Sequence, residues 1–368
     1  MLRSSFFVIT VLASSYVGGA LAAPCVDVII TGAQGGPGTH AGQAGPGTLL
    51  RYGEEANNCS DVLLQFDAGR ATNLRWSQLG VSPVAIKAVL LTHMHSDHSE
   101  GLIDILLNRW LSLPVAPKID VVCSADAKSP LGFTMSCTRF IAHSGDAFIN
   151  SGDIAERRAQ DGRRPEAGPS ALVNVMTFEP RDDAALVWSA GDVKVSAVRS
   201  THVPGHASYR VDTPAGSVVI GGDAGSDTLS PPRPSSTSSQ VERLSKGVDI
   251  IVHSAIHPVL GPDRGTGFPP PIYFRQATAP DLGAMAARAG AKHLVLTHLS
   301  PALNAAVHNG LNLPGGGVSE AGYIEAAKGS GFAGGVTVAR DLVRVRLVNG
   351  KIADEGVAEA KTGKPRAP

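Results

Sequence analysis

Three histidines and one aspartate stand within six residues, from His93 to His98, and no other feature constrains the chain as much. The mostly apolar stretch 86–91 comes directly before this run and predicts a strand buried on both faces. The run is therefore expected in the loop that leaves the C-terminal end of that strand. Imidazole and carboxylate groups are good ligands for zinc and similar divalent metals, so the run predicts a metal site. A solvated polar loop is the alternative interpretation.

The spacing inside the run favours two adjacent metals over one. Side chains two residues apart share a face of an extended chain, so His93 and His95 can approach one point together. Asp97 and His98 need a turn to diverge from that point. A lone histidine at a strand end is more often structural, but several such residues together strengthen each other as candidate ligands. Three further candidates follow predicted strands elsewhere: His202 after residues 193–198, Asp223 after 217–220 and His298 after 293–297.

The rest of the chain predicts an α/β fold with layered sheets flanked by helices. Predicted strands come in runs with hairpin turns, and helix–strand units recur in both halves of the chain. Residues 124–170 are polar and rich in Gly, Arg and Asp, which predicts an insertion or a lid over the scaffold. Residues 358–368 are expected to form a disordered tail.

The N-terminus is interpreted as a signal peptide over residues 1–22. A positively charged start is followed by an apolar run from Phe6 to Val17 and by the small-residue cleavage pattern Ala20-Leu21-Ala22. The apolar run is shorter than the roughly 20 residues that span a bilayer. A membrane anchor is the alternative, and no later segment has the pattern of a membrane span. The mature protein is therefore expected to be secreted or periplasmic.

Four cysteines stand outside the signal peptide: Cys25, Cys59, Cys123 and Cys137. An even number in an exported chain favours disulfides, and four cysteines allow three connectivities. Cys123 and Cys137 are closest in sequence, and a Cys25–Cys59 bond would then tie down the mature N-terminus. Buried free thiols are the alternative. No pair has the C-x-x-C spacing of a cysteine zinc site.

The histidine run and the later candidates together resemble the metallo-β-lactamase fold superfamily over residues 26–347. Within it the chain is most similar to the branch of ribonuclease Z, arylsulfatases and cyclic phosphodiesterases, and Asp223 in place of a cysteine suits this branch. The resemblance implies a four-layer αββα sandwich for a hydrolase domain over residues 23–357. It is carried by Val89-Leu90-Leu91-Thr92 before the run, Gly101-Leu102 after it, His202-Val203-Pro204-Gly205 before Tyr209-Arg210, Val218 to Asp223, and Thr297-His298-Leu299-Ser300-Pro301.

The resemblance also implies a ligand set for two divalent metal ions, zinc or else manganese. One ion would take His93, His95 and His202, the other Asp97, His98 and His298, and Asp223 would bridge the two. A hydroxide between the ions would attack an ester, because paired divalent ions lower the pKa of bound water and stabilise developing charge. Asp97 could also orient this nucleophile.

Two more histidines need an interpretation. The stretch 249–253 resembles the branch's strand that ends in a His-Glu pair, which makes His253 a candidate proton donor for the leaving group. Ser254 replaces the glutamate, and a structural role for His253 is the alternative. His206 competes with His202 as a ligand, but its spacing to Tyr209-Arg210 fits the family less well. We interpret it as a structural or substrate-side residue.

The substrate class follows from compartment and charge. Ribonuclease Z is cytosolic and acts on tRNA, whereas this chain is expected to be exported and carries 32 basic and 32 acidic residues without a basic stripe. A nucleic-acid partner is therefore not expected. The first hypothesis is hydrolysis of small phosphodiesters or sulfate esters. The alternatives are a lactonase or carboxyl-ester hydrolase, a ribonuclease Z-type endonuclease, and a metal-binding protein without catalysis. The sequence does not decide the oligomeric state, and a homodimer is one of the states that it allows.

Overall fold

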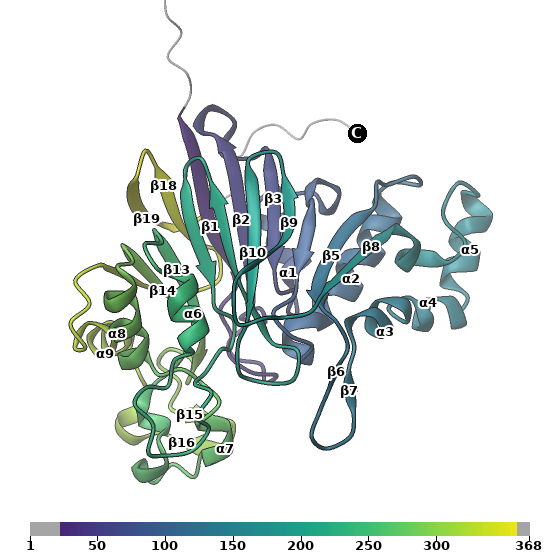
Figure 1. Cartoon of the computed structure of the whole chain (residues 1–368). Coiled ribbons are helices and arrows are strands. Elements are labelled where there is room, and N and C mark those ends of the chain that lie inside the picture. The colour runs from purple at the N-terminus through teal and green to yellow at the C-terminus, as the bar shows by residue number, and fades with distance from the viewer. Residues whose placement is uncertain (1–22, 359–368) are drawn as a thin grey trace, which may run out of the picture.

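Two β-sheets pack face to face in the computed structural model, which describes residues 23–358 (Figure 1). The predicted signal peptide and residues 359–368 of the predicted tail lie outside the described residues. Both sheets mix parallel and antiparallel neighbours. The first sheet has the order β19-β18-β1-β2-β3-β4-β5-β8, and the second has the order β17-β14-β13-β12-β11-β10-β9.

The strands have the following bounds. In the first sheet they are β1 (Pro24–Gly32), β2 (Gly47–Glu54), β3 (Val62–Phe66), β4 (Ala88–Leu90), β5 (Ile119–Ser124), β8 (Val173–Phe178), β18 (Val343–Val348) and β19 (Lys351–Val357). In the second they are β9 (Ala185–Ala190), β10 (Val193–Arg199), β11 (Ala207–Thr213), β12 (Gly216–Ile220), β13 (Ile250–Ile256), β14 (His293–Ser300) and β17 (Gly335–Val338). Two small hairpins lie outside the sheets: β6 (Ala127–Lys128) with β7 (Thr134–Met135), and β15 (Val307–His308) with β16 (Leu311–Asn312).

Helices cover the outer face of each sheet. The apolar sides of α1 (Thr72–Gln78) and α2 (Ser96–Ser112) pack on the first sheet, and those of α6 (Ser239–Leu244), α8 (Ala279–Ala289) and α9 (Glu320–Lys328) pack on the second. Within residues 23–358, none of the helices combines the length and apolar character needed to cross a membrane. The order helix, sheet, sheet, helix confirms the predicted four-layer αββα sandwich.

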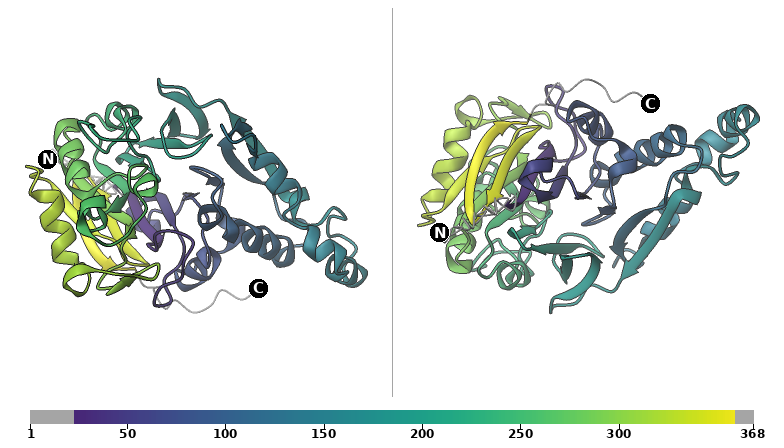
Figure 2. Two further views of the ribbon diagram at one scale, coloured as in Figure 1. Left: turned by 90° about the horizontal axis from the view of Figure 1, so that it is seen from below. Right: turned by 90° about the horizontal axis from the view of Figure 1, so that it is seen from above.

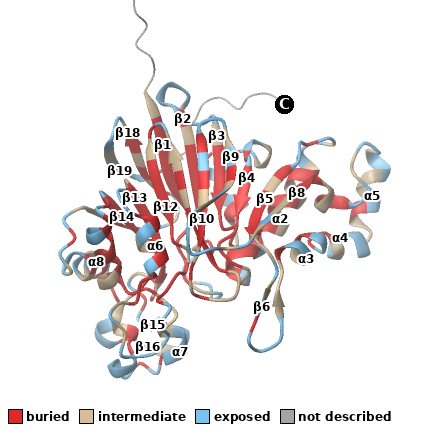
Figure 3. Ribbon diagram, viewed as in Figure 1, coloured by how far each residue is buried: buried red, intermediate tan, exposed pale blue. Residues whose placement is uncertain are grey.

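The central core lies between the two sheets, where the strands are buried (Figure 3). Along β10 the side chains of Val193, Val195 and Ala197 face this core and alternate with more exposed neighbours, as expected for a strand with one solvated face. By contrast, β1 and β4 are buried on both faces, because α1 and α2 cover their other side. This second pattern explains why the stretch before the histidine run is mostly apolar.

The first residue of the predicted disordered tail is held by the fold. The turn Asn349-Gly350, where both residues have positive φ, joins β18 to β19 as a tight hairpin. Ala358 then packs in the core between the first sheet and the helices α1 and α2. Its N–H donates to the carbonyl oxygen of Leu342 at 2.7 Å. The prediction of disorder from residue 358 is therefore wrong for Ala358, because an apolar side chain and a backbone hydrogen bond hold it.

Part of the histidine run is helical. The strand β4 ends at Leu90, and α2 already begins at Ser96, so Asp97 and His98 lie in the first helical turn. The prediction of a loop holds for residues 91–95 and is wrong for 96–98. The helix start supplies the turn that separates Asp97 and His98 from the two earlier histidines. Gly101 permits this placement, because a Cβ there would overlap the carbonyl oxygen of Gly69.

The predicted insertion, residues 124–170, contains the β6–β7 hairpin followed by the helices α3 (Cys137–Ala142), α4 (Asp146–Asn150) and α5 (Asp153–Gln160). The helices extend away from the sandwich, whereas the hairpin hangs below the ends of β5 and β8 (Figures 1 and 2). A Cys123–Cys137 disulfide joins β5 to α3, and a Cys25–Cys59 disulfide joins β1 to the segment before β3. Disulfides were expected, and among the three connectivities left open this is the one that pairs the cysteines closest in sequence.

The close approach at Gly101 yields a stability prediction. In Gly101→Ala the better helix propensity of alanine adds about 1 kcal/mol, but overlap with a backbone oxygen costs about 1–3 kcal/mol. We expect a net loss of stability and a lower Tm in thermal unfolding. The matched control is Gly322→Ala in α9, where the added methyl meets only side-chain atoms at 3.3 Å and beyond. Equal stability of the two variants would contradict this account of α2.

Candidate metal centre

Seven side chains converge where strands of both sheets end. Those of the first sheet come from the segment after β4 and the start of α2, and those of the second sheet follow β10 and β12 or lie in β14. Six of the seven are buried, and His95 is partly exposed. All seven were predicted as metal ligands: His93, His95, Asp97, His98, His202, Asp223 and His298.

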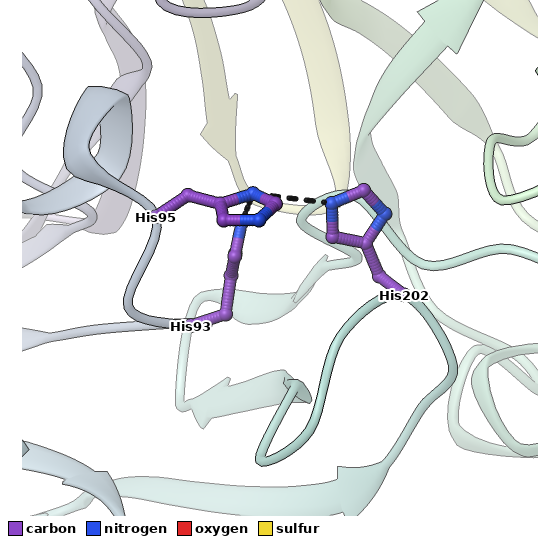
Figure 4. Close-up of side chains that lie close together, drawn as sticks. All are labelled: His93, His95 and His202. Atoms are coloured by element: carbon purple, nitrogen blue, oxygen red, sulfur yellow. Dashed lines mark hydrogen bonds between the residues drawn. The ribbon is translucent and has the colours of Figure 1, made fainter. Parts of the chain in front are cut away.

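The first cluster consists of His93, His95 and His202 (Figure 4). The ring nitrogens His93 Nε2 and His95 Nδ1 are 2.9 Å apart, and His202 Nε2 is 3.4 Å from the same His95 atom. One nitrogen from each ring lies within 4.8 Å of the others. Three imidazole nitrogens aimed at one point match a common ligand set for zinc.

The second cluster consists of Asp97, His98 and His298. The Asp97 oxygen Oδ2 lies 3.4 Å from His298 Nε2 and 3.7 Å from His98 Nε2. These atoms also lie within 4.8 Å of one another. A carboxylate with two imidazoles is a second donor set that suits zinc and similar divalent ions.

Asp223 lies between the two clusters. Its Oδ2 is 3.3 Å from His298 Nε2 and 3.5 Å from His98 Nε2 on one side, and 3.7 Å from His202 Nε2 on the other. The same carboxylate also forms a third set with His93 and His98. A single carboxylate in contact with both clusters can bridge two ions.

Buried atoms without partners test whether a metal fits. Among the described residues, His98 Nε2 and Asp223 Oδ1 are buried and have no hydrogen-bond partner. Buried polar atoms are normally satisfied, and each exception needs an explanation. Both atoms belong to the clusters, so ions bound there would satisfy them. The residues present therefore fit a divalent-metal centre.

Asp67, which the sequence analysis missed, holds the first sheet's part of the site together. Its carboxylate accepts hydrogen bonds from the Thr92 N–H at 2.7 Å and from the Thr92 hydroxyl, and it accepts one from His98 Nδ1 at 2.8 Å. The bond to Nδ1 leaves Nε2 of His98 free to face the cluster. A carboxylate behind a ligating histidine fixes its tautomer and orientation. Asp67 directly follows β3, the same kind of position that singled out His202, so the signal was present.

His206 supports the site rather than joining either cluster. Its Nε2 accepts a hydrogen bond from the Asp223 N–H at 3.1 Å, and its Nδ1 lies 2.8 Å from the Ser200 hydroxyl. A ring that already accepts from a backbone N–H has no lone pair for a metal. The interpretation of His206 as a structural residue agrees with this placement, and His202 is the histidine that reaches the first cluster.

Electrostatics divides the histidines into two groups. Burial lowers the pKa of His93 well below its usual value and lowers that of His202 to about 4, so both are neutral at pH 7. Burial alone would also lower the pKa of His98, but the charges of Asp223 and Asp67 outweigh it and raise that pKa well above the usual value. Burial opposes ionisation of Asp97, yet its hydrogen bond with His298 and nearby charges lower its pKa to about 2.

His253, the candidate proton donor, is fully buried in the middle of β13. Its Nδ1 donates to the carbonyl oxygen of Ser254 at 2.8 Å, so the neutral ring carries its proton there and Nε2 holds a lone pair. Burial lowers the pKa of His253, which disfavours the protonated form that could donate. This geometry favours the structural alternative, and the donor role stays a prediction.

Two cavities open onto the metal centre. One of about 270 Å³ lies over Asp97, Asp223 and His298 and is bounded by the loop of residues 35–37. The other, of about 870 Å³, is bounded by the β6–β7 hairpin and the segment 199–206. The larger volume lies within the usual range for small-molecule sites, about 300–1,000 Å³, and the smaller lies just below that range.

Comparison with known proteins agrees with this architecture. No family model matches the chain. Ribonuclease Z of Mycobacterium avium (strain 104) is 26% identical over 326 residues, which is 88% of this chain and 98% of that protein. The metallo-beta-lactamase fold protein YhfI from Bacillus subtilis aligns with a TM-score of 0.55 and 18% identity, over 88% of this chain and 99% of YhfI. The short form of human tRNase Z aligns with a TM-score of 0.53 and 16% identity, over 86% and 98% of the two chains.

The chain is thus an α/β protein with the metallo-β-lactamase fold. It is similar over most of its length to proteins named ribonuclease Z, in line with the motif resemblance.

The raised pKa of His98 predicts that zinc binding releases protons. In the metal-free protein His98 is protonated at pH 7, and a ligating imidazole must lose that proton. Zinc affinity should therefore fall as the pH is lowered from 8 to 6. The measurement is calorimetric titration with zinc in two buffers of different ionisation enthalpy, where the observed heats should differ. Equal heats in both buffers would contradict the charge assigned to His98.

The Asp67–His98 contact predicts an effect on metal affinity. In Asp67→Asn the ring of His98 loses its anchoring carboxylate, and loss of such a partner weakens metal binding about 10–100-fold. Competition with a zinc chelator measures this affinity. The matched control is Asp146→Asn, which alters an Asp–His pair of similar geometry on the exposed helix α4. If both variants bind zinc like the parent protein, Asp67 does not orient a ligand.

Proposed function

We propose that this chain is an exported, dinuclear metal-dependent hydrolase of small phosphodiesters or sulfate esters. The observation that carries the proposal is the position of Asp223, whose buried carboxylate contacts both three-residue clusters. A site for one ion would need neither the second cluster nor a shared carboxylate. Zinc is the first candidate ion and manganese the second, because the donor set of imidazoles and carboxylates suits both.

Paired divalent ions would supply Lewis acidity toward the ester and would activate water near neutral pH. The residues of the chain contribute orientation and charge. With a pKa of about 2, Asp97 is ionised at neutral pH, and its carboxylate is a hydrogen-bond acceptor that can orient a water molecule for attack. Such a weak base is better suited to positioning than to removing a proton.

The charge of the site supports an anionic substrate. Two divalent ions would bring four positive charges, whereas Asp97, Asp223 and the Asp67 carboxylate behind His98 bring three negative ones and the metal-bound imidazoles would be neutral. With neutral water bound, the loaded centre would keep one net positive charge. Phosphodiesters and sulfate esters are anions, so they gain from this field, whereas a lactone or another carboxyl ester does not.

Export is supported by two features. The N-terminal pattern of residues 1–22 is that of a signal peptide. Each of the four cysteines is paired in one of two disulfides, and disulfides persist mainly in oxidising compartments such as the periplasm or the exterior. We therefore propose a secreted or periplasmic location for the mature protein.

Cleavage of RNA is the second candidate function. It is favoured by one observation: the curated relatives that match most of the chain bear the name ribonuclease Z. Against it stands the balanced charge of the chain, because nucleic-acid binders depend on basic surface to contact phosphates. Both candidate functions would use the same metal centre, and both allow a phosphodiester as the cleaved bond. The size of the substrate that is cleaved therefore distinguishes them.

A substrate panel tests the proposal. Mature protein loaded with zinc or manganese is assayed on bis-p-nitrophenyl phosphate, p-nitrophenyl sulfate, a lactone and a precursor tRNA. We expect turnover of one or both of the small anionic esters and less than a hundredth of that rate on the lactone. Cleavage of the tRNA alone would favour the second candidate. No turnover by protein that holds two metals would contradict a hydrolase.

The variant His95→Ala removes one ligand of the first cluster. We expect at least a thousandfold loss of kcat on the active substrate, because removing a ligand of a catalytic metal disrupts activation of the nucleophile. The control is His143→Ala, which removes an exposed histidine of the α3–α4 segment. Unchanged kcat in His95→Ala would overturn the assignment of the site.

A further inference from the structure

The two cavities at the metal centre share three lining residues: His95, His202 and Arg275. The histidines belong to the first cluster, and Arg275 is the cationic residue at the boundary. A substrate whose ester lies at the metal centre and whose organic group fills the larger cavity must pass this residue. The role of Arg275 is therefore a question about substrate recognition.

The Arg275 side chain makes no hydrogen bond or ion pair with the other described residues. Among residues 23–358, no acidic side chain forms an ion pair with it, and its Nε is buried without a hydrogen-bond partner. In the same cavity the other arginine, Arg199, is paired with Asp182 at 2.7 Å and with Asp227 at 3.4 Å. A partly buried cation without a counter-ion is costly unless a ligand supplies the negative charge.

The backbone of Arg275, by contrast, is firmly placed. Its carbonyl oxygen accepts a hydrogen bond from His202 Nδ1 at 3.3 Å, which ties it to a predicted metal ligand. A Cβ at Gly225 would lie 2.5 Å from the same oxygen, so glycine is needed for the close approach. Two residues further on, the carbonyl of Ala277 accepts the N–H of Ile256. A side-chain substitution at position 275 should therefore leave these backbone contacts in place.

The larger cavity has an apolar wall. The β6–β7 hairpin contributes Leu131, Phe133 and Met135, and Pro204 and Leu229 also line the cavity. Leu131 is 85% exposed and Phe133 is 50% exposed, although large apolar side chains gain from burial. A bulky apolar group in this cavity would cover both.

We propose that Arg275 binds an anionic oxygen of the substrate ester while the β6–β7 cavity holds its organic group. The substrate class is then an anionic ester, phosphate or sulfate, that carries a bulky apolar or aromatic group. This inference deepens the proposed function and rests on it. Arg275 acts as a specificity-determining residue, because a guanidinium forms paired, charge-assisted hydrogen bonds with such oxygens and gains nothing comparable from a neutral ester.

The first test compares Arg275→Gln and Arg275→Lys with the parent enzyme, all loaded with zinc. In Arg275→Gln we expect KM for the hydrolysed anionic ester to rise about tenfold or more, since a hydrogen bond to a charged group is worth at least that factor, while kcat changes less than threefold. Arg275→Lys should recover part of the loss. KM for the neutral ester p-nitrophenyl butyrate should change less than twofold. Parallel assays on bis-p-nitrophenyl phosphate and p-nitrophenyl sulfate decide between phosphate and sulfate.

Calorimetric binding of phenylphosphonate, with zinc content measured on the same samples, supplies a readout that does not depend on turnover. Arg275→Gln should keep the parent zinc content and bind this probe at least tenfold more weakly. The control is Arg264→Gln, an exposed arginine of the same segment that lines neither cavity. Unchanged affinity in Arg275→Gln, or an equal loss for neutral and anionic esters, would overturn the inference. If the parent protein binds phenylphosphonate through Arg275 but hydrolyses no ester, the proposed function fails and the anion site stands.

A second variant, Phe133→Ser, tests the apolar wall. It should weaken binding of phenylphosphonate at least threefold and leave binding of methylphosphonate unchanged, because only the larger probe reaches the hairpin. The control Val115→Ser changes an exposed apolar side chain remote from the cavity. An equal effect on both probes, or none, would overturn the assignment of the cavity to the organic group.

Discussion

The buried carboxylate of Asp223 is the contact on which the rest of the site depends. It lies where strand ends of the two sheets meet, and it touches His98 from the first sheet and His202 and His298 from the second. Burial opposes its ionisation, but the charges of His298 and His98 lower its pKa well below the usual value, so it remains an anion. A buried anion surrounded by imidazoles is stable only if positive charge is supplied, by protonated histidines or by metal ions. The fold thus prepares a position for cations before any ion binds.

Much of this arrangement could be predicted from the sequence, for identifiable reasons. Period-two patterns and apolar runs located the strands, and ligand-type residues just after them indicated a shared edge. That reasoning found all seven converging residues, because each stands at or beside a strand end. It also favoured disulfides, and the observed pairs are those of one of the three connectivities that it left open. The helix start at Ser96 was missed, because a histidine-rich run carries no apolar periodicity and the tertiary hydrogen bond from the Gly101 N–H to the Ala68 carbonyl oxygen is not visible in the sequence.

Other parts were not predicted, because the roles of these residues depend on contacts that form only in the folded chain. Asp67 follows a strand, as the ligand candidates do, but its supporting role is seen only when Thr92 and His98 share its carboxylate. Arg275 lies outside any motif, and it stands out because its side chain has no ion-pair partner among the described residues. The resemblance suggested His253 as a proton donor, whereas its hydrogen bond to the Ser254 carbonyl and its burial favour a neutral ring. Sequence similarity singled out this residue, but it did not indicate the protonation state of its ring.

The account depends most on the claim that two ions occupy the centre. Native mass spectrometry of the mature protein, reconstituted with excess zinc and freed of weakly bound metal, tests it directly. The account predicts two zinc ions per chain in the parent protein and a loss of occupancy in Asp223→Ala. At most one zinc ion in the parent protein, or two in both proteins, would contradict a dinuclear centre bridged by Asp223.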